Sequence, residues 1–192
     1  MRRMDSETLE TLVGGTGDTM PILVIPDPIL KARCRAVGPA DAGAVRALLP
    51  KMFATMYRAP GIGLAAPQVG IKLRVAIVDV MPDEKPAPIA MINPEIVAAS
   101  ADLATREEGC LSIPGQYAEV TRPAWVKIRF SNVEGARREI EAEGLLAACL
   151  QHEIDHLDGV LFIDYLSSLK RNIIVRRLAK ELRQKRDEAA GR

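Results

Sequence analysis

The chain has 192 residues, of which 48% are hydrophobic and 27% charged, and its formal net charge is +1. This length and composition predict one globular domain, and the near-zero net charge gives no reason to expect DNA binding. No apolar run approaches the roughly 20 residues that a membrane-spanning helix needs. Residues 1–19 lack the apolar core of a signal peptide. We therefore expect a cytoplasmic protein with a flexible tail over residues 1–19 and one domain over residues 20–192.

The first predicted elements are strands grouped around one helix. A short strand is expected at residues 21–24, and a helix begins at Pro39-Ala40-Asp41 and ends near residues 58–61, before a loop over residues 61–70. Further strands are expected at residues 73–80, 89–92 and 95–97, and then a hairpin of residues 125–131 with residues 139–143.

The hydrophobic period changes to that of a helix after the hairpin. Apolar residues from Leu145 to Leu157 repeat at helical spacing, and Gly159 is placed to end this helix. A strand-like run follows at residues 160–163, and a last helix is expected at about residues 167–187. Grouped strands with helices set apart predict the α+β class. We expect antiparallel or mixed sheets around a central helix, and a C-terminal helix.

Both histidines of the chain lie in the sequence His152-Glu153-Ile154-Asp155-His156, within the predicted central helix. Side chains at i and i+4 lie about 40° apart in azimuth and about 6 Å apart along the axis, so both imidazoles can reach one ion. Glu153 is turned about 100° from His152, so it can reach water on that ion without taking a ligand position. This HExxH pattern predicts a catalytic metal site with Glu153 as general base.

The third ligand has to come from outside this segment, because neither common peptidase pattern is complete. Phe162 stands where one group has a third histidine, and Glu181, a possible donor for another, lies among basic residues. Cys110 is the best candidate, since it lies in a polar, glycine-containing segment, whereas Cys149 lies in an apolar run and Cys34 between two arginines. A thiolate and two imidazoles leave the fourth position of a tetrahedral ion open for water.

Three separated segments resemble the motifs of peptide deformylases. GIGLAAPQ, from Gly61 to Gln68, resembles the first motif, GxGxAAxQ. EGCLS at residues 108–112 resembles the second, and QHEIDH at residues 151–156 resembles the third, QHExDH. The motifs occur in the family's order, and the resemblance covers roughly residues 20–178.

The resemblance implies a cytoplasmic hydrolase of protein biosynthesis that removes the formyl group from the N-terminal formylmethionine of nascent polypeptides and releases formate. It implies that Cys110, His152 and His156 hold one divalent ion. That ion is expected to be Fe2+ in the cell, with Zn2+, Ni2+ or Co2+ as replacements, among which these ligands do not choose. It also implies that Glu153 activates water and passes a proton to the departing amine. The side-chain amide of Gln68 and the N–H of Leu111 would then stabilise the oxyanion.

An apolar pocket for the methionine side chain is expected beside the metal site. Gly63 and Gly61 would let the peptide backbone approach closely. Two departures from the family concern fine specificity: Tyr117 replaces an arginine seven residues after the cysteine, and Arg106 stands where others have an apolar residue. The candidate walls of the pocket are Ile62, Leu145, Ala148 and Cys149.

Other functions stay open on the residues alone. A metallopeptidase of the HExxH type would cut internal amides, and peptides with and without a formyl group would distinguish it. A non-catalytic metal module at the ribosome is disfavoured by Glu153 and Gln68, which are not needed merely to hold an ion. The basic last helix is either a solvated face or, as the family suggests, a docking surface for the ribosome.

Overall fold

The structure is a computed structural model that describes residues 18–189 and residue 191. The tail predicted over residues 1–19 therefore lies almost wholly outside the described residues. The principal elements, in chain order, are α2 (Ala42–Arg58), β1 (Gly63–Ala65), β2 (Val75–Val78), β3 (Ile89–Ala99), β4 (Leu103–Cys110), β5 (Ile113–Pro123), β6 (Trp125–Ser131), β7 (Arg137–Glu143), α3 (Gly144–Leu157) and α4 (Ser168–Ala189).

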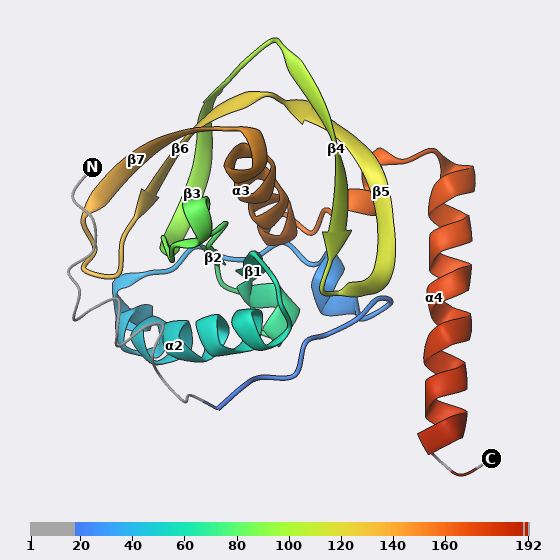
Figure 1. The fold of residues 1–192 in the computed structure, drawn as a ribbon. Helices are drawn as coiled ribbons and strands as arrows, with labels where there is room; N and C mark the ends of the chain where they lie inside the picture. The colour runs from blue at the N-terminus through green and yellow to red at the C-terminus, as the bar shows by residue number, and fades with distance from the viewer. Residues whose placement is uncertain (1–17, 190, 192) are drawn as a thin grey trace.

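Two antiparallel sheets enclose α3 (Figure 1). The larger sheet has the strand order β1-β2-β3-β6-β7, and the smaller one is the β4–β5 ribbon. Short connections carry β3 into β4 and β5 into β6, so the sheets diverge from a common apex and stand on opposite sides of α3. All pairings between these strands are antiparallel. The predicted α+β class with a central helix is therefore confirmed.

The larger sheet buries its inner face on α3. In β6, Val126 and Ile128 are buried in one cluster with Leu150 and Ile154 of α3. The alternate residues of β6 point outward, as the period of two in a strand requires, and Lys127 forms ion pairs with glutamates of β7. α3 is thus held against this sheet by a continuous apolar contact.

A second apolar layer fixes the short strands β1 and β2 between the two helices. All four residues of β2 are buried. Val75 and Ile77 pack in the cluster that contains α2, whereas Ala76 and Val78 pack in the cluster that contains α3. β1 pairs only with β2 and forms the edge of the sheet.

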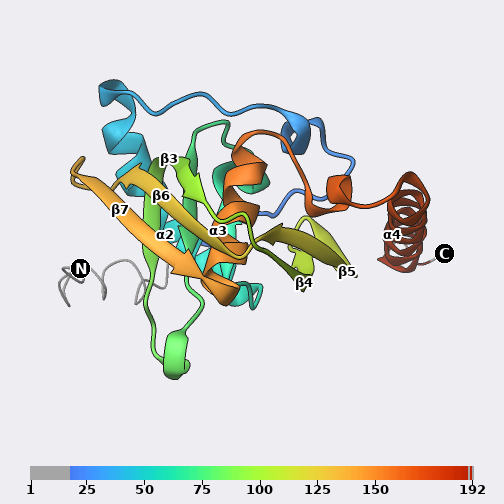
Figure 2. The same ribbon diagram turned by 90° about the horizontal axis from the view of Figure 1, so that it is seen from above.

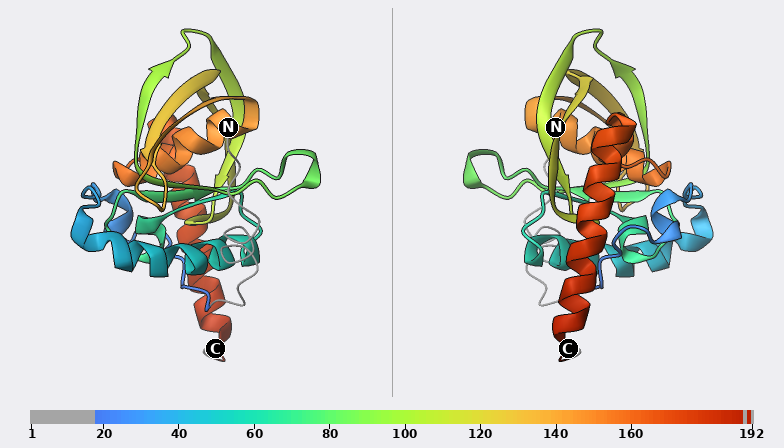
Figure 3. Two further views of the ribbon diagram at one scale, coloured as in Figure 1. Left: turned by 90° about the vertical axis from the view of Figure 1, so that its left-hand side faces the viewer. Right: turned by 90° about the vertical axis from the view of Figure 1, so that its right-hand side faces the viewer.

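The last helix, α4, stands at the side of the molecule along β5 (Figures 2 and 3). Ile174 and Leu178 are buried in a cluster with Val120 of β5, and Gln116 of β5 donates a hydrogen bond to Glu181 at 3.3 Å. The helix was predicted at about residues 167–187, in agreement with its observed bounds. The helices that the structure describes are all too short or too polar to cross a bilayer.

Several predicted elements are wrong. Residues 21–24 form no strand, because Leu23 N donates to Gln68 O and Ile25 N donates to Ser112 O, which lie on two different segments. Residues 160–163 run into a 3₁₀ turn, η5 (Phe162–Tyr165), instead of a strand. The two strands predicted at residues 89–97 are one strand that continues past Asn93, whose side chain is bonded to the backbone of Val37. The predicted loop 61–70 contains β1 and the 3₁₀ turn η3 (Ala66–Val69), and the ribbon β4–β5 was not predicted.

Candidate active site

The metal-ligand candidates meet where β4 ends against α3. The rings of His152 and His156, one helical turn apart, have their centroids 5.0 Å apart. Cys110 is the last residue of β4, and its Sγ lies 3.2 Å from Nε2 of His156. One ligand atom from each of the three residues lies within 4.8 Å of the other two. The structure therefore brings together the three side chains that were expected to bind an ion.

The surroundings of these side chains fit a cation. Nδ1 of His152 lies 2.9 Å from Oε2 of Glu108, which leaves Nε2 free for an ion, in the carboxylate–histidine–metal arrangement. Oε2 of Glu153 is buried, and the described residues offer it no hydrogen-bond partner. A buried carboxylate oxygen without a partner is costly. A water on an ion held by His152 would supply that partner.

Glu153 lies fully inside the protein between α3 and β1. Burial raises the pKa of Glu153 to about 7, because desolvation penalises the charged carboxylate. A Cβ atom added to Gly63 of β1 would lie only 2.3 Å from Oε1 of Glu153 and 2.9 Å from Sγ of Cys149. Glycine at position 63 is therefore what lets β1 approach the carboxylate. Sγ of Cys149 also lies 3.5 Å from the carbonyl oxygen of Ile62.

Gln68 presents its amide group to the same centre from η3. Its Oε1 accepts a hydrogen bond of 2.8 Å from the N–H of Ala65, which fixes the amide so that Nε2 is the donor that faces Cys110 and Ser112. Nε2 lies 3.1 Å from Oγ of Ser112 and 3.5 Å from Sγ of Cys110. The side chain is buried, so this N–H donor is held in place before any substrate arrives.

Leu111 directly follows Cys110 in the turn between β4 and β5. Its backbone N–H therefore lies one residue from the thiol. Its side chain faces Gly61, where an added Cβ would come within 2.8 Å of Cδ1 of Leu111. The turn is thus packed closely against the segment that leads into β1, and a side chain at position 61 would collide with that of Leu111.

A buried ionic network stands behind His152, and no local sequence pattern predicts it. Arg122 of β5 donates to both carboxylate oxygens of Glu108, at 2.6 and 3.0 Å, and to Asp155 at 2.7 Å. The hydroxyl of Tyr165 donates a hydrogen bond of 2.9 Å to Asp155. The guanidinium of Arg122 lies 4.6 Å from the ring centroid of Tyr165. Burial raises the pKa of Glu108, but hydrogen bonds from His152 and Arg122 outweigh it and lower that pKa. Glu108 therefore remains an anion that orients the histidine.

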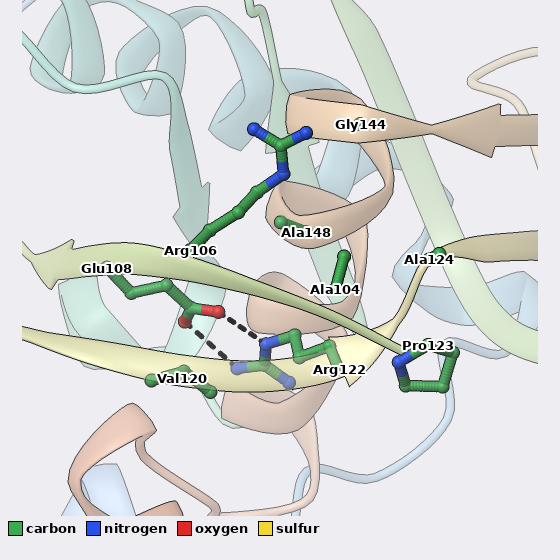
Figure 4. Close-up of a pocket in the computed structure, with 9 residues that line it drawn as sticks. All are labelled: Ala104, Arg106, Glu108, Val120, Arg122, Pro123, Ala124, Gly144 and Ala148. Carbon is green, nitrogen blue, oxygen red and sulfur yellow. Dashed lines mark hydrogen bonds and ion pairs between the residues drawn. The ribbon is translucent and has the colours of Figure 1, made fainter. Parts of the chain in front are cut away.

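The residues that were predicted to line the methionine pocket lie in different surroundings. Ala148 of α3 lines a pocket together with Arg106 and Glu108 of β4 (Figure 4). Leu145, at the start of α3, is 50% exposed, and Ile62 is 40% exposed. Gly63 and Cys149 lie against Glu153, as described above, and Cys149 is buried.

Several residues outside the proposed metal-ligand set have other roles in the fold. Phe162 is buried and stacks on His152, with the ring centroids 6.3 Å apart. Glu181 lies on α4 and accepts from Gln116. Cys34 is buried, and its N–H donates to the carbonyl of Leu157. Tyr117 is 65% exposed, and the edge of its ring lies against Gly109.

Proteins with similar sequences support this interpretation of the site. Residues 19–172 match the family model described as polypeptide deformylase. The chain is 48% identical over 166 residues to a peptide deformylase of Agrobacterium fabrum, which covers 86% of this chain and 97% of the relative. It is 51% identical over 166 residues to a peptide deformylase of Mesorhizobium japonicum, covering 86% of this chain and 94% of that protein.

Solved structures give the same result. A crystal structure of a peptide deformylase from Legionella pneumophila superposes with a TM-score of 0.82 at 44% identity, and it covers 88% of this chain and 98% of that one. The peptide deformylase of Ehrlichia chaffeensis in complex with actinonin has a TM-score of 0.82 at 37% identity, covering 86% and 98%. The chain therefore belongs to the polypeptide deformylase family, the hydrolases that remove the N-formyl group from new polypeptides.

Proposed function

We propose that Cys110, His152 and His156 bind one divalent metal ion, and that Glu153 and Gln68 act on a formyl peptide held beside it. The observation that carries this proposal is the convergence of the thiol, two imidazoles and an unpartnered buried carboxylate oxygen at the junction of β4 and α3. When bound, such an ion acts as a Lewis acid and makes a nucleophile available near neutral pH. Fe2+ is the ion that we propose for the cell.

Glu153 carries the proton in this proposal. Its buried position and raised pKa suit a group that accepts a proton from the attacking water and then gives it to the amine that leaves. The packing of Gly63 and Cys149 against the carboxylate holds it in one place, so no reorganisation is needed between the two transfers.

Gln68 and Leu111 stabilise the negative charge that develops on the formyl oxygen. Nε2 of Gln68 is a fixed, buried donor next to Cys110. The N–H of Leu111 belongs to the residue that follows Cys110, in the turn between β4 and β5. Donors that are already oriented toward a developing oxyanion contribute about 3–4 kcal/mol each to the rate.

The peptide backbone binds along β1 in this proposal. β1 is the edge strand of the larger sheet, so it offers unpaired backbone groups to an extended chain. Gly63 lies on this strand beside Glu153, so the N-terminal end of a peptide bound here would lie near the metal-ligand candidates. Ile62, Leu145, Ala148 and Cys149 are proposed contacts of the first side chain. Residues 20–192 act as one catalytic unit.

The basic face of α4 is proposed to dock on the ribosome, which would bring the enzyme to nascent peptides in the cytoplasm. Its basic residues include Arg176, Arg177 and Lys180, and the helix touches the rest of the chain mainly through Ile174 and Leu178. Ribosome binding that survives removal of residues 171–192 would contradict this part.

The proposed ligand set is tested by measuring metal content and reaction on the same sample. Protein prepared without oxygen is assayed with a formyl-Met tripeptide and with the same tripeptide lacking the formyl group. We expect formate from the first and no cleavage of either internal amide. Cys110→Ser should lose most of the bound ion, because a hydroxyl is a poor replacement for a thiolate, whereas Cys34→Ser should keep it. Full metal content in Cys110→Ser would overturn the ligand assignment.

A further inference from the structure

The face of β4 that meets α3 continues beyond the metal-ligand candidates. Cys110 contacts His156, and Glu108 contacts His152. Two residues earlier on the strand, Arg106 approaches the first turn of α3, where an added Cβ on Gly144 would lie 3.7 Å from its Nη2. Strand residues two apart share a face and lie about 6.6 Å apart, and one helical turn rises about 5.4 Å. His156 and His152 are one turn apart, in step with Cys110 and Glu108. Gly144 lies two turns before His152, and the length of the Arg106 side chain lets it reach that far.

A pocket lies at this last step, one to two helical turns from His152. Ala148 and Gly144 of α3 form one side of it, and the ribbon β4–β5 forms the other, with Arg106 and Glu108 from β4 and Arg122 from β5 (Figure 4). The space between them is small, about 10 Å³, and the stem of Arg106 runs beside Ala148 with its guanidinium toward Gly144. Arg106 is exposed, so its side chain can move outward to admit a ligand. In the proposed function Ala148 contacts the first side chain of the substrate, so that side chain would come to this pocket.

The cationic groups of this pocket differ in whether they are already engaged. The guanidinium of Arg122 is held by Glu108 and Asp155. Arg106, in contrast, has no ion-pair or hydrogen-bond partner among residues 18–189. The N-terminus of α3 lies at the same place, and the side chain of its N-cap residue, Glu143, makes no capping bond. Because Arg106 is exposed, its donors at this end of the pocket face solvent and have no acceptor among the described residues.

We propose that Arg106 sets the specificity of this enzyme for the first side chain and extends it to chains that end in a hydrogen-bonding oxygen. This inference rests on the proposed function of the site. The chemical class is an N-formyl peptide whose first residue is unbranched and ends in a carboxylate or sulfoxide oxygen, as in glutamate or oxidised methionine. A guanidinium binds a carboxylate with two parallel N–H groups and can donate to the single oxygen of a sulfoxide, and the positive end of the helix favours the carboxylate as well.

The test compares formyl tripeptides that differ only in the first residue, which is methionine, norleucine, glutamate or methionine sulfoxide. Specificity is the ratio of kcat/KM for each oxygen-terminated peptide to that for norleucine. In Arg106→Leu this ratio should fall by about ten- to a hundredfold, the loss expected for one charge-assisted hydrogen bond. In Arg106→Gln, which keeps a donor without the charge, the sulfoxide ratio should fall less than the glutamate ratio.

The matched control is Arg138→Leu, which removes an exposed arginine from β7 of the other sheet and should leave all ratios unchanged. Ratios that change less than twofold in Arg106→Leu would overturn the inference. Failure of the wild-type protein to release formate from any of the four peptides would instead overturn the proposed function, so the two failures are distinguishable.

Discussion

A single added methyl group at Gly63 should displace the carboxylate of Glu153. The Cβ of an alanine at this position would lie 2.3 Å from Oε1 of Glu153, although real Cβ contacts lie beyond 3.0 Å. The carboxylate therefore has to move by at least about 0.7 Å. Because a misplacement of about 1 Å can cost a hundredfold in rate, we expect kcat/KM of Gly63→Ala to fall between about ten- and a hundredfold.

The assay is formate release from a formyl-Met tripeptide, with metal content and circular dichroism measured on the same protein. Gly43→Ala is the matched control, because no heavy atom lies within 4 Å of its added Cβ. Position 43 is in α2, where alanine should raise stability by up to about 1 kcal/mol. A folded, fully metal-loaded Gly63→Ala protein that works within twofold of the wild-type rate would refute the reasoning.

Two further predictions follow from the buried polar groups of the site. Arg122→Leu leaves Glu108 and Asp155 without their cation, and should lower the free energy of unfolding by about 3–5 kcal/mol, measured by urea denaturation. The control is Arg129→Leu, which loses an exposed ion pair and should lower the free energy of unfolding by less than about 1 kcal/mol. An Arg122→Leu midpoint equal to that of Arg129→Leu would contradict the first prediction. Gln68→Met removes the buried amide donor at nearly constant volume, so kcat should fall by about 10²–10³-fold with metal retained, and an unchanged kcat would exclude Gln68 from oxyanion stabilisation.

The central helix and its metal-ligand candidates were predictable because both depend on local spacing. The period of apolar residues identifies α3, and the i, i+4 spacing of His152 and His156 places both rings on one face whatever the rest of the chain does. Cys110 was the best candidate for the third ligand from its polar, glycine-containing segment, and the resemblance to a family strengthened that assignment. Its approach to His156 depends on how β4 folds over α3, which no local pattern specifies.

The β4–β5 ribbon could not be predicted from hydrophobic alternation. Residues 103–107 of β4 are exposed or only partly buried, so the strand carries no apolar stripe of period two. The ribbon is stabilised instead by pairing along its whole length and by the buried ionic network at Glu108. Arg122 is one of 26 basic residues in the sequence, and its burial follows from the register that sets Arg122 opposite Ala104, which is a tertiary property.

The most direct test of the account concerns Glu153 in the metal-loaded protein. Wild-type protein and Glu153→Gln are prepared without oxygen, and metal content and formate release from a formyl-Met tripeptide are measured on the same samples. The substituted amide would keep the size of the side chain but could not carry the proton, so the variant should retain its ion and lose about 10²–10⁴-fold in rate. A Glu153→Gln protein that holds its ion and releases formate at the wild-type rate would contradict the account.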